Sequence, residues 1–358
     1  MNHYGVIMAG GGGTRFWPLS RQKTPKQLLN LSGKDLLVNE AVERMATVIG
    51  KSNIFIVTAD VQAPAMLTAT QGKVFPRNIL AEPAARNTAA CIGYSAMEIL
   101  RKYGDGVMII TPADHYIEDV PALTEIFKTA ILTAEDQDKL VTIGLRPTFP
   151  STGFGYIKYE PEVDSNVKPV IEFREKPDEE TAKKYIDSGH YAWNSGMFIW
   201  KASLILEKLK EYAHDIYEDL KTIGDAMNTP KEQEVLHDVY PIIRKISIDY
   251  AVMEPCATKG DVLVIPGDCG WNDVGSWDMM DILHDPDANG NVLLGDVIAV
   301  DTKNTVIYSS TRTVTAVDVE NIVIVETPDA IMVCRKDKAQ EVKKIVDQLN
   351  TVGRKDLL

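Results

Sequence analysis

The sequence lacks several features that would place it in common classes of protein. No apolar run approaches the roughly 20 residues needed to cross a bilayer, and no basic segment followed by an apolar stretch marks a signal peptide. The four cysteines form no CxxC pair and the six histidines no HExxH, which disfavours a zinc site or a disulfide framework. A net charge of −13 disfavours nucleic acid or an anionic membrane as a partner. We therefore expect a cytoplasmic protein that binds neither.

Buried-strand runs alternate with amphipathic stretches through the first half of the chain. This alternation predicts an α/β fold with a mostly parallel, Rossmann-like sheet and helices on both faces. The expected strands are residues 4–8, 53–58, 106–111 and 139–145, and the expected helices are residues 36–49, 61–71, 87–102 and 122–135. Ligands of such sheets bind beyond the carboxyl ends of the strands. Residues 151–255 contain no linker and are assigned to the same domain, which we place at residues 1–284.

Residues 285–358 have a different sequence pattern, in which short runs repeat. They are expected to form a small C-terminal β-rich domain. The run "AVDTKNTVI" (299–307) matches "AVDVENIVI" (316–324) at six of nine positions, offset by 17 residues, and "ETPDAIMV" (326–333) is a looser copy. Short strands at this period predict stacked coils, as in a short β-helix. A meander of ordinary hairpins remains an equal alternative. An amphipathic helix over residues 338–349 is expected to pack against the stack.

A glycine-rich loop follows the first expected strand, within "GVIMAGGGGTRFWPLSRQKTPKQLL" (5–29). The first 34 residues contain five cations and no acid, which is unusual in an acidic protein. The loop fits neither the dinucleotide fingerprint nor the P-loop, because the required third glycine and the Gly-Lys-Ser/Thr are missing. Glycines let backbone amides approach a polyphosphate, with Arg15 as a bidentate fork and Lys26 as a point charge. A solvated flexible loop is the alternative, which the apolar Phe16 and Trp17 argue against.

The segment "GGGGTRFWPLSRQKTPKQ" resembles the signature of the sugar-phosphate nucleotidyltransferases, and most closely that of the mannose-1-phosphate guanylyltransferases. Further stretches resemble the same family in the same order: "EPAARNTAA", "TPADH", "FREKP", "WNSGMF", "DYAVME" and "GWNDVGSW". Together they cover about residues 4–277. Two departures are Phe16, where the family often has Leu, and Arg174, where it often has Val.

The resemblance implies the reaction GTP + mannose 1-phosphate → GDP-mannose + pyrophosphate. It implies a nucleotide site made of Gly10, Gly11, Gly12, Gly13, Thr14, Arg15, Lys26, Glu82, Arg86 and Asn87. A carboxylate such as Glu82 accepts from the N1–H and the 2-amino group of guanine, which adenine does not offer. Asn87 could instead be the N-cap of the following helix.

The resemblance also implies a sugar-phosphate site and a metal site. The sugar phosphate would meet Gly155, Tyr156, Glu175, Lys176 and Asn194. Asp114 and Asp273 match the family's metal-binding positions and would hold Mg²⁺ or another divalent cation, as two carboxylates commonly do. The expected catalytic residues are Arg15, Lys26, Asp114 and Asp273. His115 is expected to orient its neighbours, and Asp249 either lines the sugar pocket or caps a helix.

Two other functions remain open from the sequence. One is a nucleotidyltransferase for another nucleotide and sugar 1-phosphate, and the other is a regulatory homologue that binds nucleotide-sugar without turnover. A dehydrogenase is disfavoured by the broken fingerprint. Some relatives carry a further C-terminal mannose-6-phosphate isomerase domain, which no segment here is long enough to supply, so we expect a single activity. Repeat-like coils often mediate self-association, which favours a homodimer.

Overall fold

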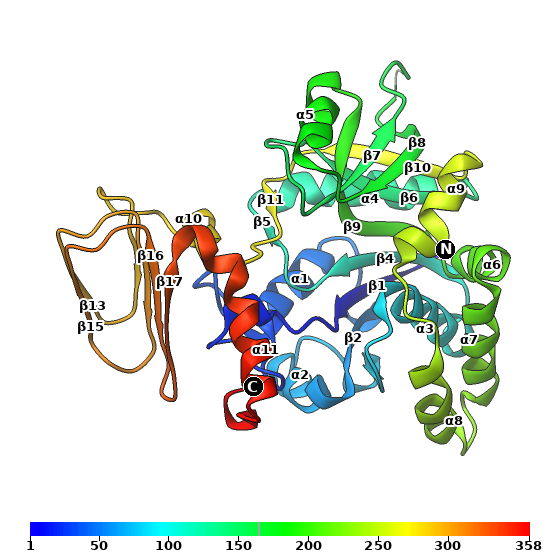
Figure 1. Ribbon diagram of the computed structural model, residues 1–358. Helices are drawn as coiled ribbons and strands as arrows, with labels where there is room; N and C mark the ends of the chain where they lie inside the picture. Colours follow the sequence, from blue (N-terminus) through cyan, green and yellow to red (C-terminus); the bar gives the residue numbers. More distant parts are fainter. Residues whose placement is uncertain (164) are drawn as a thin grey trace.

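The computed structural model describes residues 1–163 and 165–358, and a nine-stranded sheet forms the centre of its larger part (Figure 1). The strand order is β3-β2-β1-β4-β9-β6-β10-β8-β7. The strands are β1 (Asn2–Ala9), β2 (Ile54–Ala59), β3 (Ile79–Glu82), β4 (Gly106–Pro112), β6 (Leu140–Leu145), β7 (Gly155–Tyr159), β8 (Lys168–Glu175), β9 (Tyr191–Lys201) and β10 (Val262–Gly267). All four strands predicted for the first half of the chain are present.

The first four strands in this order are parallel, and the pairings that flank β9 are antiparallel. β1 pairs in parallel with β2 and β4, and β2 with β3, whereas β9 runs antiparallel to both β4 and β6. Because β6, β10 and β7 run in the same direction as β1, the expected mostly parallel sheet is confirmed, and only β8 and β9 run the opposite way within it. The carboxyl ends of β1, β3 and β4 meet the start of β9 at one edge, because β9 runs in the opposite direction.

Helices cover both faces of the sheet. One face packs against α3 (Asn87–Lys102), α6 (Ala202–Tyr212), α7 (His214–Ala226) and α8 (Glu232–Val239), and the other against α1 (Leu37–Met45), α2 (Ala63–Ala69) and α4 (Val120–Asp136). α3 has the bounds predicted for it, while α1 ends four residues earlier than expected and α2 is shorter by two residues at each end. Further helices are α5 (Glu179–Ser188), α9 (Glu254–Thr258) and α10 (Met280–Leu283). Within the described residues, none of the helices combines the length and apolar character needed to span a bilayer.

The C-terminal part is a short β-helix, drawn in orange at one end of the molecule (Figure 1). β12 (Val292–Leu294), β14 (Val306–Ser309) and β16 (Ile322–Glu326) pair in parallel, as do β13 (Val297–Val300) and β15 (Val314–Val317). The register places Val306 opposite Val323, one 17-residue repeat apart. Stacked coils are confirmed, and the hairpin meander is not.

The expected third copy of the repeat is wrong. β17 (Ile331–Arg335) returns antiparallel to β16 instead of adding a parallel coil. A tight turn causes the reversal: the amide of Thr327 donates to the carbonyl of Ala330 (2.9 Å), and its hydroxyl donates to Asp329 (2.9 Å). The predicted last helix is present as η9 (Lys336–Val342) and α11 (Lys343–Thr351).

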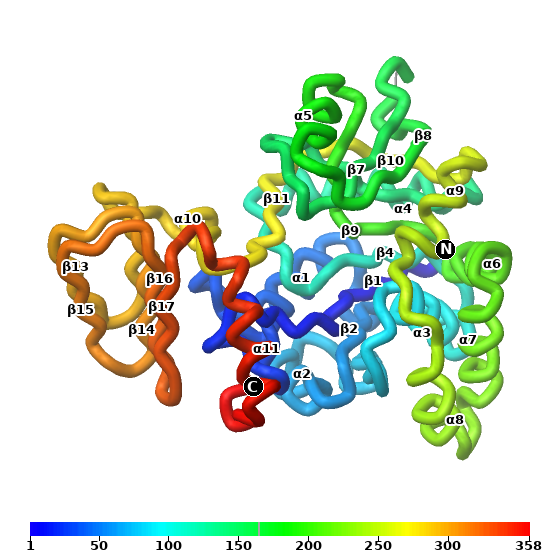
Figure 2. The backbone as a smooth tube through the Cα atoms, in the orientation of Figure 1, coloured from blue at the N-terminus to red at the C-terminus, as the bar shows by residue number. Residues whose placement is uncertain are grey.

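A third apolar cluster joins the glycine-rich loop to the β-helix. Phe16 packs against Trp277, with ring centroids 5.3 Å apart, and both are fully buried with Val323 of the β-helix. α11 consequently lies beside the N-terminal loop although the two are at opposite ends of the chain (Figure 1, Figure 2). The apolar residues of the loop are thus anchors, and the flexible-loop alternative does not hold.

Gly13 sets the path of the loop. It adopts a left-handed conformation (φ +59°), and an added Cβ would lie 2.2 Å from the Cβ of Lys26. By contrast, a Cβ on Gly11 would meet nothing within 4 Å. Gly13 is therefore required for the close approach of Lys26, and Gly11 leaves the loop surface open.

We predict that Gly13→Ala destabilises the fold and Gly11→Ala does not. The left-handed conformation alone costs an alanine about 1–2 kcal/mol, and the clash with Lys26 adds to it. Thermal melts of both variants and the wild type test this. Equal melting temperatures for the two alanine variants would contradict the assigned role of Gly13.

Candidate active site

Lys26 connects two aspartates that are far apart in the sequence. Its ammonium donates to the carbonyl of Asp114 (2.9 Å), to Oδ2 of Asp114 (3.0 Å) and to the carbonyl of Asp273 (2.7 Å). The side chain is only 5% exposed, and Asp114 is 37% exposed. An ammonium has three protons, and all three are donated here. Lys26 therefore holds the Asp114 and Asp273 segments together.

A short two-stranded sheet brings those segments together. β5 (Tyr116–Ile117) follows Asp114 and pairs antiparallel with β11 (Trp271–Asn272), which precedes Asp273. The next residue, Val274, has φ +41° and is fully buried. A β-branched residue in this region is strained, and such strain clusters at functional sites. Asn272 supports the turn by accepting from the amide of Val274 (2.7 Å).

The two carboxylates have opposite electrostatic environments. Burial acts to raise the pKa of Asp114, but the charge and hydrogen bond of Lys26 outweigh it, so the pKa lies below its ordinary value. Burial raises the pKa of Asp273, with Asp114 adding to the rise and Lys26 and Arg15 offsetting part of it. The positive charges near Asp273 therefore do not fully offset the cost of burying its ionised carboxylate.

The two aspartates fit a divalent cation. Oδ1 of Asp273 is buried and receives no hydrogen bond from the described residues. Those residues contain no group of three or more His, Cys, Asp or Glu that could enclose an ion. Mg²⁺ commonly uses one or two carboxylates and completes its shell with water and substrate phosphates. The donor set therefore suits Mg²⁺ and not a closed structural metal site.

Arg15 lies on η1 (Thr14–Phe16) beside Asp273. Its Nη1 donates to the carbonyl of Gly275 (3.1 Å) and to Oε1 of Gln340 (2.8 Å). A Cβ on Gly275 would lie 2.9 Å from Nη1 of Arg15 and 3.2 Å from Oδ2 of Asp273. Glycine at 275 therefore leaves room between the guanidinium and the carboxylate.

The glycine loop is held in place by a glutamine that the sequence analysis did not single out. Nε2 of Gln27, on η2 (Lys26–Leu28), donates to the carbonyls of Ala9 and Gly11, the second at 3.1 Å. Gln27 is 2% exposed, whereas Gly10, Gly11 and Gly12 are exposed. The sequence feature that points to Gln27 is its position directly after Lys26, in the run "TPKQ".

Glu82 ends β3 next to the glycine loop. A Cβ on Gly10 would lie 2.9 Å from Oε2 of Glu82, and Oε1 accepts from the hydroxyl of Tyr240 (2.5 Å). Burial raises the pKa of Glu82 to about 7, although the Tyr240 hydrogen bond acts to lower it. Tyr240 was not predicted, because nothing local in the sequence relates it to Glu82.

Arg86 and Asn87 lie at the start of α3, as the sequence predicted. Asn87 has φ +68° and accepts from the amide of Thr88 (2.8 Å), so it is not a conventional N-cap. Nε of Arg86 is buried, and no described residue accepts from it.

Gly155, Glu175 and Asn194 form a second group. Gly155 pairs with Glu175, and a Cβ on Gly155 would lie 2.5 Å from Oε2 of Glu175 and 3.4 Å from Cβ of Asn194. Nδ2 of Asn194 donates to Asp249 (2.7 Å), and burial raises the pKa of Asp249. Asp249, left open by the sequence, therefore belongs to this group and caps no helix through its side chain.

This second group lies close to the aspartates. Oδ1 of Asn194 accepts from the amide of Gly196 (3.1 Å). A Cβ on Gly196 would lie 3.6 Å from Pro112, which ends β4 just before Asp114. Both groups thus lie at the same edge of the sheet.

Other predicted residues have different surroundings. The Tyr156 side chain is fully buried and donates to the carbonyl of Ser151 (3.0 Å), so the contact predicted for Tyr156 would be made by its backbone. Lys176 is 61% exposed, 3.2 Å from Glu175. Arg174, the departure from the family pattern, is exposed and pairs with Glu172.

His115, which was expected to orient its neighbours, contacts Trp271. Its Nδ1 accepts from Nε1 of Trp271 (2.9 Å) across the β5–β11 pair. Burial is the main cause that lowers the pKa of His115, to about 4. The ring is therefore neutral at neutral pH.

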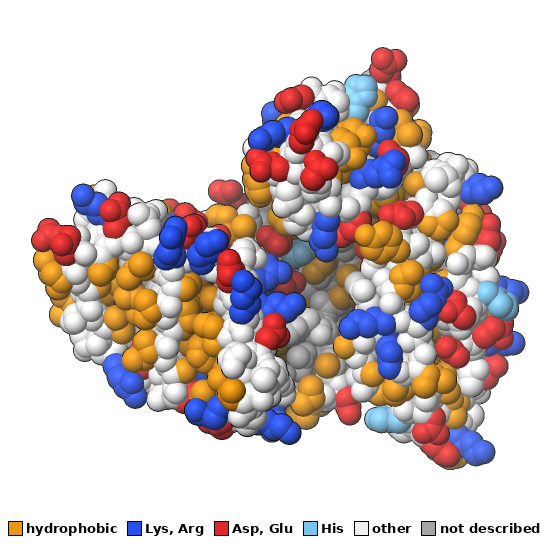
Figure 3. All heavy atoms as spheres, viewed as in Figure 1, with side chains coloured by type: hydrophobic (Ala, Val, Ile, Leu, Met, Phe, Trp, Pro, Cys, Tyr) orange, Lys and Arg blue, Asp and Glu red, His pale blue; other side chains and the backbone are white. Residues whose placement is uncertain are grey.

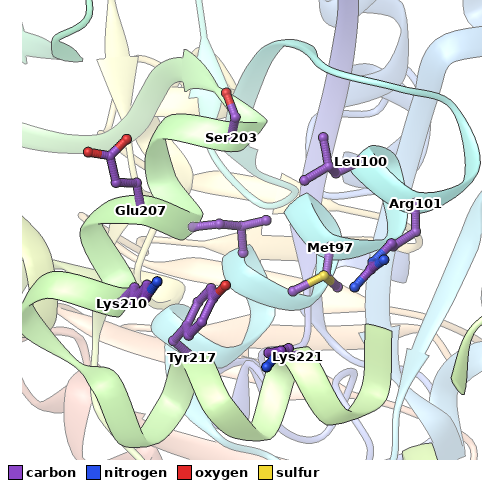
Figure 4. A pocket seen from close by; sticks show the side chains of 9 residues that line it. Met97, Leu100, Arg101, Ser203, Glu207, Lys210, Tyr217 and Lys221 are labelled. Carbon is purple, nitrogen blue, oxygen red and sulfur yellow. The ribbon is translucent and has the colours of Figure 1, made fainter. Parts of the chain in front are cut away.

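A groove of about 500 Å³ lies elsewhere, among side chains of α3, α6 and α7 (Figure 4). Met97, Leu100 and Tyr217 line it, with Arg101, Lys210 and Lys221 among the charged residues. Its lining contains none of the residues of the two groups described above, so it is separate from them.

We predict that Glu82 makes stability fall as pH rises. The folded protein holds the Glu82 proton up to about pH 7, while the unfolded chain loses it near pH 4.5. Stability linked to the neutral form is therefore present in acid and is lost as pH rises through 7. Glu82→Gln lacks this loss and keeps the Tyr240 hydrogen bond. Melting curves between about pH 5 and 8 should show the wild type falling relative to the variant; parallel curves would contradict the assignment.

Comparison with known proteins identifies the family of the chain. Residues 4–285 match the family model "Nucleotidyl transferase", and residues 295–349 match "MannoseP isomerase/GMP-like beta-helix domain". A protein of Xanthomonas campestris pv. campestris, "Xanthan biosynthesis protein XanB", is 41% identical over 98% of this chain and 74% of its own length.

Two further comparisons cover almost the whole chain. "Mannose-1-phosphate guanylyltransferase" of Escherichia coli K12 is 38% identical over 98% of this chain and 74% of that protein. A crystal structure from Thermus thermophilus, described as a "mannose-1-phosphate geranyltransferase", superposes with a TM-score of 0.87 at 32% identity, over 98% of this chain and all of that one. The resemblance in the motifs is confirmed, and the chain is an enzyme of the mannose-1-phosphate guanylyltransferase family of sugar nucleotidyltransferases.

Proposed function

We propose that the protein transfers the GMP unit of GTP to mannose 1-phosphate, giving GDP-mannose and pyrophosphate. The observation that carries the proposal is the Lys26 bridge, which places the Asp114 and Asp273 segments beside an open glycine loop at the carboxyl ends of β1 and β4. The name of the Escherichia coli relative supports the choice of substrates.

The reaction needs no protein nucleophile. An oxygen of mannose 1-phosphate attacks the α-phosphorus of GTP in line; the new P–O bond forms as the bond to the β-phosphate breaks, and pyrophosphate leaves. Because the attacking phosphate is already anionic, no general base is required. Catalysis then consists of positioning and charge neutralisation.

The chain's own cations have different parts in that neutralisation. Arg15 lies beside the segment that carries Asp273 and would meet the phosphates of the nucleotide as a bidentate donor. Lys26 was expected to contact phosphate, but its three protons are donated to Asp114 and Asp273. We propose that Lys26 acts by its charge and by holding the aspartates in place.

A divalent cation fits the same place. Bound by Asp114 and Asp273, Mg²⁺ would neutralise charge on phosphate oxygens that belong to both substrates. The buried Oδ1 of Asp273, which no described residue satisfies, is the atom that supports this assignment most directly.

The second group would bind the sugar phosphate. Glu175 and Asn194 offer acceptors and donors for sugar hydroxyls, and the exposed ammonium of Lys176 would meet the phosphate. Glu82, deprotonated, would accept from the Watson–Crick edge of guanine beside Gly10.

A substrate panel tests the proposal. Pyrophosphate release is measured for each of the four common NTPs with a set of sugar 1-phosphates, and GTP with mannose 1-phosphate should give the highest kcat/KM. Another best pair would favour the alternative nucleotidyltransferase. No turnover with any pair would favour a regulatory homologue, although the presence of Arg15, Lys26, Asp114 and Asp273 argues against one.

We predict that Asp273→Asn separates activity from stability. Turnover should fall about 100-fold or more, the size associated with losing one preorganised electrostatic group. The melting temperature should stay the same or rise, because burial already disfavours the ionised carboxylate. Steady-state kinetics and thermal melts measure both.

Asp285→Asn is the matched control, since Asp285 is exposed and lies outside the two groups. It should leave both quantities unchanged. Wild-type turnover in Asp273→Asn would remove the metal assignment.

We also propose that the protein is a homodimer. Several apolar side chains of the β-helix are exposed, among them Ile298 (56%), Val317 (65%), Ile331 (59%) and Val333 (60%). Figure 3 shows apolar side chains gathered on this end of the molecule. Contiguous exposed apolar surface often marks self-association, and light scattering of the purified protein would reveal a monomer if this is wrong.

A further inference from the structure

The C-terminal domain reaches the proposed nucleotide site through Gln340. Oε1 of Gln340, on η9, accepts from Nη1 of Arg15 at 2.8 Å. Nε2 of the same amide donates to Oγ of Ser276 at 2.6 Å. Ser276 is fully buried and follows Gly275, whose carbonyl accepts from the same Nη1 of Arg15 (3.1 Å). One amide therefore connects Arg15 to the segment that carries Asp273.

The chemistry of the partners fixes the direction of this amide. Arginine only donates, so the oxygen of Gln340 must face Arg15. The amino group then faces Ser276, whose hydroxyl donates onward to Asp278. Each hydrogen bond in the chain Arg15–Gln340–Ser276–Asp278 thus joins a donor to an acceptor.

We propose that Gln340 is a positioning residue for Arg15 in the nucleotidyl transfer, so that the C-terminal domain completes the nucleotide site. The inference rests on the proposed function, in which Arg15 binds the phosphates of GTP. A neutral amide orients the guanidinium without cancelling its charge. The full positive charge then remains available to the triphosphate.

The fold gives this contact a rigid base. η9 lies against η1, which carries Arg15, and against η8 (Trp277–Met279), which follows Ser276. Ala339, next to Gln340, is buried in the apolar cluster that also contains Phe16 and Trp277. The cluster therefore fixes the backbone on both sides of Gln340, and only the amide itself projects to Arg15.

Two substitutions separate positioning from mere structural support. Gln340→Leu removes the acceptor, and Gln340→Glu replaces it with a carboxylate that pairs with Arg15 and cancels its charge. The matched control is Glu341→Gln on the same element, where Glu341 is exposed and pairs with Lys338 and Lys344. The full chain is used, with kcat/KM for each substrate at saturating concentration of the other, and a thermal melt.

We expect Gln340→Leu to lower kcat/KM for GTP about tenfold, the size of one hydrogen bond to a charged group. Gln340→Glu should lower it at least as much while keeping the wild-type melting temperature. KM for mannose 1-phosphate should change in neither variant, and Glu341→Gln should behave as the wild type.

Other outcomes would overturn the proposal. Wild-type kcat/KM for GTP in both variants would show that Arg15 needs no help from Gln340. Equal losses for both substrates that follow the melting temperature would show a structural contact only.

Failure of the proposed function is recognised separately, because the wild type would then release no pyrophosphate from GTP and mannose 1-phosphate. In that case the same proteins are titrated with Mg²⁺-GTP by calorimetry. Weaker binding by both Gln340 variants supports the positioning role, and unchanged binding removes it.

Discussion

One ammonium group organises the proposed active site. Lys26 donates its three protons to Asp114 and Asp273, which lie 88 and 247 residues further along the chain. Because a buried ammonium is costly without partners, the folded protein keeps those two segments close enough to satisfy it. The same contacts oppose the mutual repulsion of two carboxylates that must share one end of the sheet. The left-handed Gly13 and the strained Val274 are the backbone adjustments that allow this approach.

The two domains meet in a common core that is built around the glycine-rich loop. Phe16 and Trp17 belong to the loop, Trp277 follows Asp273, and Val323 belongs to the β-helix, yet all four are buried in one cluster. The loop that we propose presents amides and cations to phosphates is thereby held on one side by apolar packing. The β-helix consequently packs against the loop that carries the proposed site. The hydrogen bond between Arg15 and Gln340 adds a polar contact between the same two parts.

Local patterns in the sequence were sufficient to predict much of the fold. The bounds of α3 and the parallel coils of the β-helix followed from periodicity and from the 17-residue repeat. The third coil, expected from a loose similarity of sequence, does not form. A hydrogen-bonded turn at Thr327 reverses the direction of the chain there. The meeting of Asp114 with Asp273 depends on strands of two residues each, β5 and β11, which are too short to leave a periodic signal. Gln340 lies 325 residues from Arg15, and no local pattern relates the two.

A crystal structure of the protein with Mg²⁺ and GDP-mannose tests the central claim most directly. The account predicts a metal ion bound by the carboxylates of Asp114 and Asp273, with the mannose beside Glu175 and Asn194 and Lys26 still joining the two aspartate segments. A nucleotide-sugar bound away from this edge of the sheet, or a metal ion that contacts neither aspartate, would contradict it.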